Sequence, residues 1–230
     1  MTASLIMDDV GRHNTGQRVV QLDQVRAYED CSTICIVPTR GVITARVVQN
    51  WMGMMTPMNQ KFSRMFIAGA EVGEAYNAAI TQILANPELS KWKYILTLEE
   101  DNLPPPDGLL KLYQSIGNYG AVGGLYWTKG PDGQPMIYGD PAVLPMNFLP
   151  QRPLPDTTQE CNGLGMGFTL FRLDLFKQMP GPWFKTLQVP GACYTQDLYF
   201  FEHAKRAGFR FACDTRVRVG HYSASEEIVW

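Results

Sequence analysis

The sequence predicts an α/β fold, a single domain in which helices flank a mostly parallel sheet. Short apolar segments alternate with segments of helical periodicity from about residue 32 onward, which is typical of parallel strands with helices between them. The apolar run 94–98 is followed at once by three carboxylates, at positions 99–101. A polar cluster at the end of a buried strand lies where open α/β sheets bind ligands.

In the first half of the chain, each predicted strand is followed by a helix. The strands are rich in β-branched and aromatic residues, and the helices carry apolar residues three and four positions apart. Pro38 ends the first strand, and Gly69 separates the second strand from its helix. The elements in order are strand 33–37, helix 41–51, strand 62–68, helix 71–85, strand 94–98 and helix 107–113.

The second half of the chain begins with a short strand, 121–126, after which the regular pattern stops. Seven of the sixteen prolines fall between Pro131 and Pro155, which predicts a long irregular loop that is either a functional lid or disordered. Regular elements then return, in the order strand 165–171, helix 173–178, helix 197–207 and the last strands 209–213 and 217–219.

Composition leaves the binding partners open. The chain has 230 residues, 45% hydrophobic and 18% charged, enough to bury the core of one domain. Its net charge of −2 provides no general attraction to nucleic acid or to acidic membranes, although local patches remain possible. The cysteines lack the spacing of a disulfide framework or a zinc site, so we expect reduced, mostly buried thiols at Cys31, Cys35, Cys161, Cys193 and Cys213.

The sequence shows no transmembrane segment and no secretion signal. No apolar run approaches the roughly 20 residues that span a bilayer, and the N-terminus lacks a basic region followed by a hydrophobic core. We therefore expect a cytoplasmic protein. Its first residues, 1–31, are polar and weakly patterned, which indicates an arm or an irregular lead-in.

Two polar segments should meet at one edge of the predicted sheet. The triplet Glu99 to Asp101 follows one strand, and Pro38-Thr39-Arg40 lies at the end of another. Clustered carboxylates repel one another unless a cation compensates them, and Mg²⁺ is held by one or two carboxylates together with substrate phosphates. An arginine beside such a cluster suits a nucleotide diphosphate. Alternatively, the triplet is a solvated turn and Arg40 is an ordinary surface residue.

In this order, the motifs resemble those of a family 2 glycosyltransferase of the GT-A (Rossmann-like) fold. The resemblance spans residues 32–222, and four segments carry it: 36–40, 95–106, 165–176 and 195–221. It implies a nucleotide-sugar-binding half at 32–127, the Pro-rich loop at 128–160, an acceptor and catalytic half at 161–222 and a C-terminal tail at 223–230. Each segment alone is a weak signal, because short acidic turns and glycine-rich strands occur in many folds.

The resemblance assigns donor-binding roles to the acidic turn and to the first loop. Glu99-x-Asp101 takes the place of the family's Asp-x-Asp, with Asp101 as metal ligand and Glu99 near the ribose, the metal or its water. Glutamate departs from the usual aspartate, so Glu100 could contribute instead. The implied nucleotide-binding residues are Pro38, Thr39, Arg40, Glu71, Asn77, Glu99 and Glu100. Asn77 could equally be an ordinary helix residue.

Two residues near the C-terminus complete the implied site. Asp197, in a Gln-Asp pair where relatives commonly have Glu-Asp, is the implied general base. It also suits an N-cap or first-turn position of the helix that follows. His221 resembles the histidine that completes the metal site, with Asp101 and Glu99; a structural histidine is the alternative. Imidazole beside carboxylates favours Mn²⁺ over Mg²⁺.

The expected function is metal-dependent transfer of a sugar from a UDP- or GDP-sugar to an acceptor hydroxyl, with inversion and with Asp197 as base. The acceptor remains open among a glycan, a lipid-linked sugar, a protein and a modified nucleic-acid base, and the oligomeric state is not predicted. One alternative is a noncatalytic module that binds sugar nucleotides or glycans. A sugar nucleotidyltransferase is disfavoured, because no glycine-rich, arginine-containing phosphate loop follows the first strand.

Overall fold

The computed structural model describes residues 29–189 and 192–230. Residues Cys31–Trp230 form one compact unit, which is described below. Of the arm expected at residues 1–31, residues 1–28 lie outside the described residues. None of the helices in the described ranges has the length and apolar character needed to cross a bilayer.

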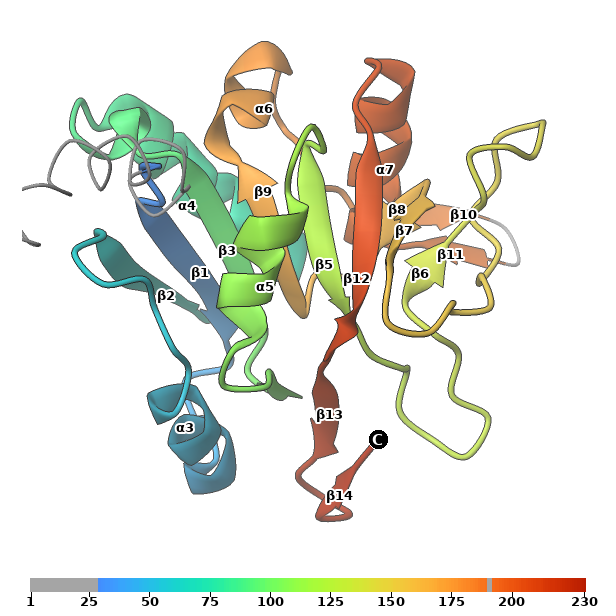
Figure 1. Ribbon diagram of the computed structural model, residues 1–230, viewed down its shortest axis with the longest axis horizontal. Coiled ribbons are helices and arrows are strands. Elements are labelled where there is room, and N and C mark those ends of the chain that lie inside the picture. The colour runs from blue at the N-terminus through green and yellow to red at the C-terminus, as the bar shows by residue number, and fades with distance from the viewer. Residues whose placement is uncertain (1–28, 190–191) are drawn as a thin grey trace, which may run out of the picture. The chain divides into compact units, whose positions relative to one another are not determined.

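A seven-stranded sheet forms the centre of this unit (Figure 1). Parallel pairing joins β1 to β2, β1 to β3 and β5 to β12, whereas β9 is antiparallel to both β3 and β5, and β7 is antiparallel to β12. Five of the seven strands therefore run in one direction, which confirms the predicted α/β class. The strand order is β2 (Phe62–Ala68), β1 (Thr33–Thr39), β3 (Tyr94–Leu98), β9 (Phe168–Arg172), β5 (Ala121–Leu125), β12 (Phe211–Arg218) and β7 (Thr158–Cys161).

Helices cover both faces of the sheet, because the side chains of its inner strands are apolar on both sides. In β1, Ile34 and Ile36 belong to one buried cluster, and Cys35 and Val37 belong to another. The first cluster includes residues of α4 (Val72–Ala85), α6 (Leu173–Gln178) and α7 (Gln196–Arg206). The second includes residues of α5 (Gly108–Ser115), in front of the sheet in Figure 1, and of α3 (Ala45–Met52).

A small sheet at the carboxyl ends of the strands positions the acidic turn. The two residues after the turn form β4 (Asn102–Leu103), which pairs with β13 (Gly220–Ser223), and β13 pairs with β14 (Ile228–Val229). Asn102 lies opposite His221 in this pairing. The remaining short elements are the pairs β6 (Ile137–Tyr138) with β8 (Gly163–Leu164) and β10 (Leu187–Val189) with β11 (Ala192–Tyr194), and a 3₁₀ helix at Leu89–Lys91.

Several predicted bounds differ from those in the structure. The two last strands predicted at 209–213 and 217–219 are wrong, because residues 211–218 form the single strand β12, whose register shifts beyond Asp214. The strand predicted at 165–171 begins only at Phe168, since residues 163–164 pair with β6 instead. The Pro-rich loop contains β6 and part of β7, and the expected tail includes β14. These differences arise from pairing between distant segments.

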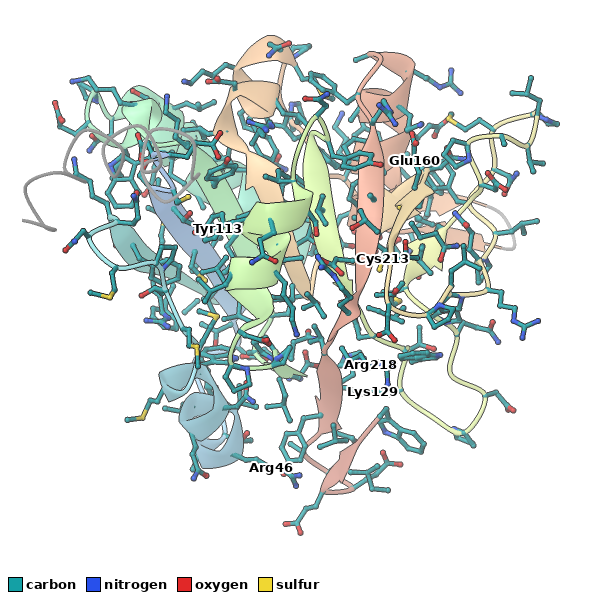
Figure 2. The ribbon with its side chains drawn as sticks, viewed as in Figure 1. Arg46, Tyr113, Lys129, Glu160, Cys213 and Arg218 are labelled. Atoms are coloured by element: carbon teal, nitrogen blue, oxygen red, sulfur yellow. The ribbon has the colours of Figure 1, made fainter. Side chains whose placement is uncertain are left out.

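The described thiols lie in or near the core. Cys35, Cys161 and Cys213 are buried, and Cys31 is half-buried; Figure 2 labels Cys213 on β12. Burial raises the pKa of Cys35 to about 12, so its thiol is a poor nucleophile at neutral pH. The side chain of Cys193 lies outside the described residues.

Candidate active site

A cavity of about 320 Å³ lies where β1 and β3 end. These two strands are parallel neighbours, so the loops that follow them meet at the same edge of the sheet. The loop after β1 and the acidic turn after β3 both line the cavity, together with the start of α4. Its lining residues are Pro38, Thr39, Arg40, Ala70, Val72, Glu99, Glu100 and Asp101.

Glu100 connects the acidic turn to the loop after β1. Its Oε2 accepts hydrogen bonds from Thr39 Oγ1 at 2.6 Å and from the Arg40 backbone N–H at 3.0 Å, and its Oε1 pairs with Arg40 Nε. Burial opposes ionisation of Glu100, but these bonds outweigh it and lower its pKa. Glu100 thus orders the loop, while the Arg40 side chain stays 87% exposed.

Glu99 is the most perturbed carboxyl of the turn. Tyr76 Oη lies 3.5 Å from Glu99 Oε1. Burial, with the negative charges of Asp101 and Asp197 adding to it, raises the pKa of Glu99 to about 8. Glu99 therefore holds its proton at neutral pH.

Asp101 is held between two nitrogen-bearing side chains. Its Oδ2 lies 2.6 Å from Lys129 Nζ and 3.4 Å from His221 Nε2, and its backbone oxygen accepts the Tyr222 N–H at 2.7 Å. Burial alone would raise the pKa of Asp101, but His221 and Lys129 outweigh it and bring the pKa to about 2. Asp101 is therefore a carboxylate at any ordinary pH. Lys129 is labelled in Figure 2, near the lower end of β12.

The environment of His221 tests whether the site fits a metal ion. His221 Nδ1 lies 2.8 Å from the Trp127 carbonyl oxygen, and because a carbonyl can only accept, Nδ1 carries a proton. Nε2 is the ring nitrogen that faces the Asp101 carboxylate, and it is the atom through which His221 would bind a metal ion in place of a proton. Residues 29–189 and 192–230 contain no group of three His, Cys, Asp or Glu side chains placed for a metal. An Asp–His pair nevertheless fits an ion whose other ligands are phosphates and water.

Asp197 lies in the first turn of α7 and is almost completely buried. Its Oδ1 accepts hydrogen bonds from Thr195 Oγ1 and from the Leu198 N–H. Burial outweighs these bonds and raises the pKa of Asp197. Its charge also contributes to the raised pKa of Tyr126. Asp197 thus occupies the first-turn position of α7 that the sequence allowed.

Four predicted residues do not line the cavity: Asp197, His221, Glu71 and Asn77. Glu71 is the N-cap of α4: its Oε2 accepts the Glu74 N–H at 3.0 Å, and its Oε1 accepts Thr186 Oγ1. The Asn77 side chain binds the loop at residues 183–184, donating to one backbone carbonyl at 2.7 Å and accepting from two N–H groups. These contacts give Asn77 a structural role, the alternative that the sequence left open.

Three residues at this edge of the sheet were not predicted. Lys129 pairs with Asp101, and Tyr126 packs edge-on against His221 while its hydroxyl accepts the Gly167 N–H at 2.8 Å. Asn102 is fully buried, and both polar atoms of its amide lack a partner within the described residues. The sequence placed Tyr126 at a strand end and Asn102 beside the acids, but no local signal distinguished Lys129 from other surface lysines.

Comparison with protein-family models finds no match, and comparison with curated proteins finds none either. Among solved structures, A197 from STIV is similar, with a TM-score of 0.63 and 18% identity over 86% of this chain and 92% of that one. Drosophila beta1,4-galactosyltransferase 7 in complex with xylobiose has a TM-score of 0.48 and 16% identity. TarS 1-349 from S. aureus in complex with UDP-GlcNAc has a TM-score of 0.46 and 14% identity.

The similarity to A197 from STIV concerns the fold, a mixed α/β arrangement built on the seven-stranded sheet. This chain aligns over 80% of its length with the galactosyltransferase and 79% with TarS, and it spans 64% and 55% of those two chains. At these identities the similarity concerns the fold, and the chemistry must be argued from the site.

Proposed function

We propose that this protein is a glycosyltransferase that moves a sugar from a nucleotide-diphosphate sugar, with UDP or GDP as the nucleotide, to an acceptor hydroxyl. One observation carries the proposal. The ionised Asp101, paired with His221, lines a cavity edged by Thr39 and Arg40. These groups suit a diphosphate, and the buried Asp197 of α7 is the carboxylate that we assign to proton transfer.

The donor side of the site suits a nucleotide. The cavity, about 320 Å³ in volume, falls within the range of ordinary ligand pockets, roughly 300–1,000 Å³. Arg40 is largely exposed at its rim, and a guanidinium can bind phosphate oxygens through two parallel hydrogen bonds. Glu100 orders the loop that carries it. When a nucleotide is bound, the backbone N–H of Arg40 would still donate to Glu100, while the Arg40 side chain would turn to a phosphate of the nucleotide.

Asp101 and His221 are the residues that would hold Mn²⁺, or Mg²⁺ in its place. When bound, such an ion supplies positive charge where the departing diphosphate becomes more negative. Glu99 could serve as a third ligand only if the ion displaced the proton that its raised pKa retains. Its neutral state limits the repulsion that Asp101 and Asp197 would otherwise feel, and so helps both to remain ionised.

Asp197 is proposed as the general base. Its raised pKa makes it a better proton acceptor than an ordinary aspartate. The acceptor oxygen gives its proton to the Asp197 carboxylate and forms a bond to the anomeric carbon. The bond from that carbon to the diphosphate oxygen breaks, and its electron pair leaves with the nucleotide. Attack from the face opposite the leaving group inverts the configuration.

The test is a panel of UDP- and GDP-sugars with Mn²⁺, in which donor hydrolysis and transfer are both measured. Asp197→Asn should lower transfer by about 10²- to 10⁴-fold, the usual effect of losing a general base, yet still bind the nucleotide. Asp174→Asn, which changes an exposed aspartate paired with Lys177, is the matched control. Full transfer by Asp197→Asn would contradict the base assignment. Nucleotide binding without turnover on every donor and acceptor would favour the noncatalytic module.

A further inference from the structure

Asn102, the residue after Asp101, carries a buried amide that has no partner. Its side chain is fully buried, and neither Oδ1 nor Nδ2 forms a hydrogen bond with any residue in the ranges 29–189 and 192–230. An amide offers two donors and two acceptor positions. Buried polar side chains in folded proteins are mostly hydrogen-bonded, because an unpaired buried group lowers stability. The exception at Asn102 therefore requires a physical explanation.

Unpaired polar groups gather in the small sheet and at α3. Within the described residues, buried side-chain atoms without a partner occur at Thr44, Asn50, Asn102 and Trp230. Two of these residues flank His221: Asn102 lies opposite it in the pairing of β4 with β13, and Trp230 exchanges two backbone hydrogen bonds of 3.0 Å with it. The other two lie at the start of α3 and within it. Both α3 and β13 lie beyond the lower ends of the main strands in Figure 1.

The backbone of Asn102, by contrast, is well connected. Its N–H donates to the Glu99 carbonyl at 3.0 Å, and its carbonyl accepts from Trp51 Nε1 at 2.9 Å. Asn102 therefore joins the acidic turn to α3, and its strand pairing joins both to β13. It is the point at which the strand that follows Asp101 meets the strand that carries His221.

The Asn102 amide lies directly against the main chain of Gly167. A Cβ atom at position 167 would come within 2.5 Å of Asn102 Oδ1 and 2.7 Å of Cγ and Nδ2, so a larger residue there would displace the amide. The Gly167 N–H donates to Tyr126 Oη at 2.8 Å, and the Gly167 carbonyl accepts the Glu99 N–H at 3.2 Å. The amide is thus packed beside backbone groups that already have partners, and it gains its own through a rearrangement of the neighbouring turn.

We propose that Asn102 is a positioning residue for Asp101 and His221, and that its amide acquires hydrogen-bond partners when a divalent cation binds this pair. The inference rests on the proposed function, which places the cation there. Such a cation would displace Lys129 Nζ, which lies 2.6 Å from Asp101 Oδ2. The acidic turn then adjusts, and the adjacent amide has donors and acceptors to stabilise the adjusted turn. Because a group that is unpaired in one state and paired in the other favours the second, Asn102 strengthens cation binding.

A purely structural asparagine would behave differently. Asn162 is such a residue: it is 1% exposed, and its Nδ2 donates to the Asn147 carbonyl at 2.9 Å. Removal of the Asn162 amide breaks a bond and lowers stability, whereas removal of the Asn102 amide eliminates an unpaired group and raises stability. The proposal therefore predicts that stability and cation affinity change in opposite directions at position 102. A structural role does not produce that combination.

The experiment measures thermal unfolding without metal, and Mn²⁺ binding by electron paramagnetic resonance with and without UDP. Asn102→Leu, which keeps the branched shape of the side chain, should unfold about 2–4 °C above the wild type and bind Mn²⁺ about tenfold more weakly. Asn102→Ala, which cannot crowd Gly167, should weaken Mn²⁺ binding to a similar extent and lose less thermal stability than Asn162→Ala. The matched controls Asn162→Leu and Asn162→Ala should lower the unfolding temperature and leave Mn²⁺ affinity unchanged.

Two results would overturn the positioning role. One is a lower unfolding temperature for Asn102→Leu together with a loss in Asn102→Ala as large as in Asn162→Ala, because the amide would then have partners in the metal-free fold. The other is an unchanged Mn²⁺ affinity in both Asn102 variants, or no Mn²⁺ binding by the wild type. If the wild type and the variants bind Mn²⁺ with the expected differences but the wild type transfers no sugar, the proposed function fails and the role of Asn102 is supported.

Discussion

Replacement of Lys129 tests how the acidic site accommodates a cation. Lys129 Nζ lies 2.6 Å from Asp101 Oδ2, where it competes with any metal ion that Asp101 and His221 would bind. Lys129→Gln keeps a polar side chain but removes the charge. We therefore expect this variant to bind Mn²⁺ more tightly than the wild type in the absence of nucleotide, although it has lost a polar contact of the site.

The size of the effect follows from the pKa of Asp101. That pKa falls from 3.8 to about 2, which corresponds to about 2 kcal/mol in favour of the charged carboxylate. His221 and Lys129 share this stabilisation, and both Lys129 and Asp101 are partly exposed to solvent, so the share of Lys129 is about 1 kcal/mol after screening. Its removal should lower the Mn²⁺ dissociation constant roughly fivefold.

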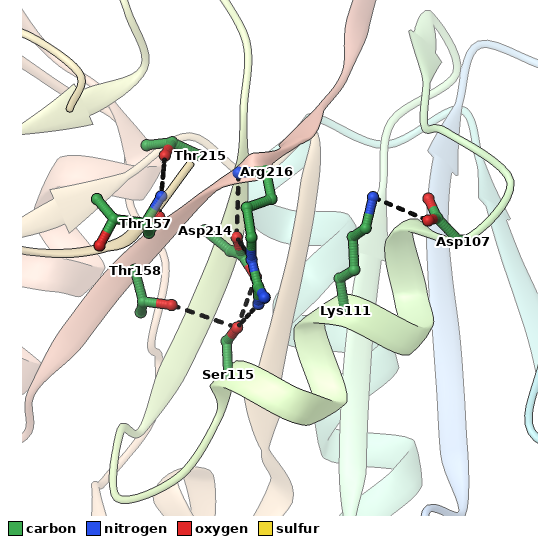
Figure 3. Close-up of polar contacts among 8 residues, drawn as sticks. All are labelled: Asp107, Lys111, Ser115, Thr157, Thr158, Asp214, Thr215 and Arg216. Carbon is green, nitrogen blue, oxygen red and sulfur yellow. Dashed lines mark hydrogen bonds and ion pairs between the residues drawn. The ribbon is translucent and has the colours of Figure 1, made fainter. Parts of the chain in front are cut away.

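The assay is electron paramagnetic resonance of free Mn²⁺ during titration of the protein. Lys111→Gln is the matched control, because Lys111 forms an ion pair of 2.8 Å with Asp107 on α5, away from the cavity (Figure 3). The reasoning is refuted if Lys129→Gln binds Mn²⁺ no more tightly than the wild type, or if Lys111→Gln tightens binding to the same extent.

Two further predictions concern stability. The folded chain holds the proton of Glu99 up to about pH 8, whereas the unfolded chain releases it near 4.5, so stability is full below pH 4.5 and falls as pH rises to 8. Glu99→Gln should flatten this fall in thermal unfolding. Asp214 is fully buried and is bound by Arg216 and Ser115 (Figure 3), and Asp214→Ala should cost about 2 kcal/mol in urea unfolding by removing these hydrogen bonds to a charged group.

Matched variants make both predictions decisive. Glu88→Gln, at an exposed glutamate paired with Lys91, should preserve the pH dependence that Glu99→Gln removes. If the stability of Glu99→Gln fell with rising pH as steeply as that of the wild type, the Glu99 carboxyl would not be the source of the fall. Asp174→Ala, at an exposed ion pair, should cost less than about 1 kcal/mol. An equally small cost for Asp214→Ala would mean that the network at Ser115 contributes nothing to stability.

Local signals were sufficient for much of the sheet. The strands 62–68 and 94–98 and the helix 173–178 have the predicted bounds, because β-branched runs and helical spacing depend on residues near one another in the chain. The shared edge of the loop after β1 and the acidic turn also follows from local order, since neighbouring parallel strands end on the same side. The sequence thereby indicated the cavity that Thr39, Arg40 and Asp101 line.

Side-chain partners depended on contacts between distant segments. The sequence offered Glu100 as a possible donor-binding residue but did not indicate its partners, and the turn after β3 directs it to Thr39 and Arg40. Asn77 lies on the predicted helix, but the loop at 183–184 determines its hydrogen bonds.

The sequence by itself determined the α/β class, the order of most strands and helices, and the acidic turn at the end of a buried strand. Only the tertiary structure decided what surrounds that turn. The pairing of β4 with β13 brings His221 to Asp101 across more than a hundred residues, and the Pro-rich loop returns Lys129 to the same carboxylate. The physical reason is that burial and charge act between groups that are close in space, and closeness of this kind follows from strand pairing rather than from local spacing.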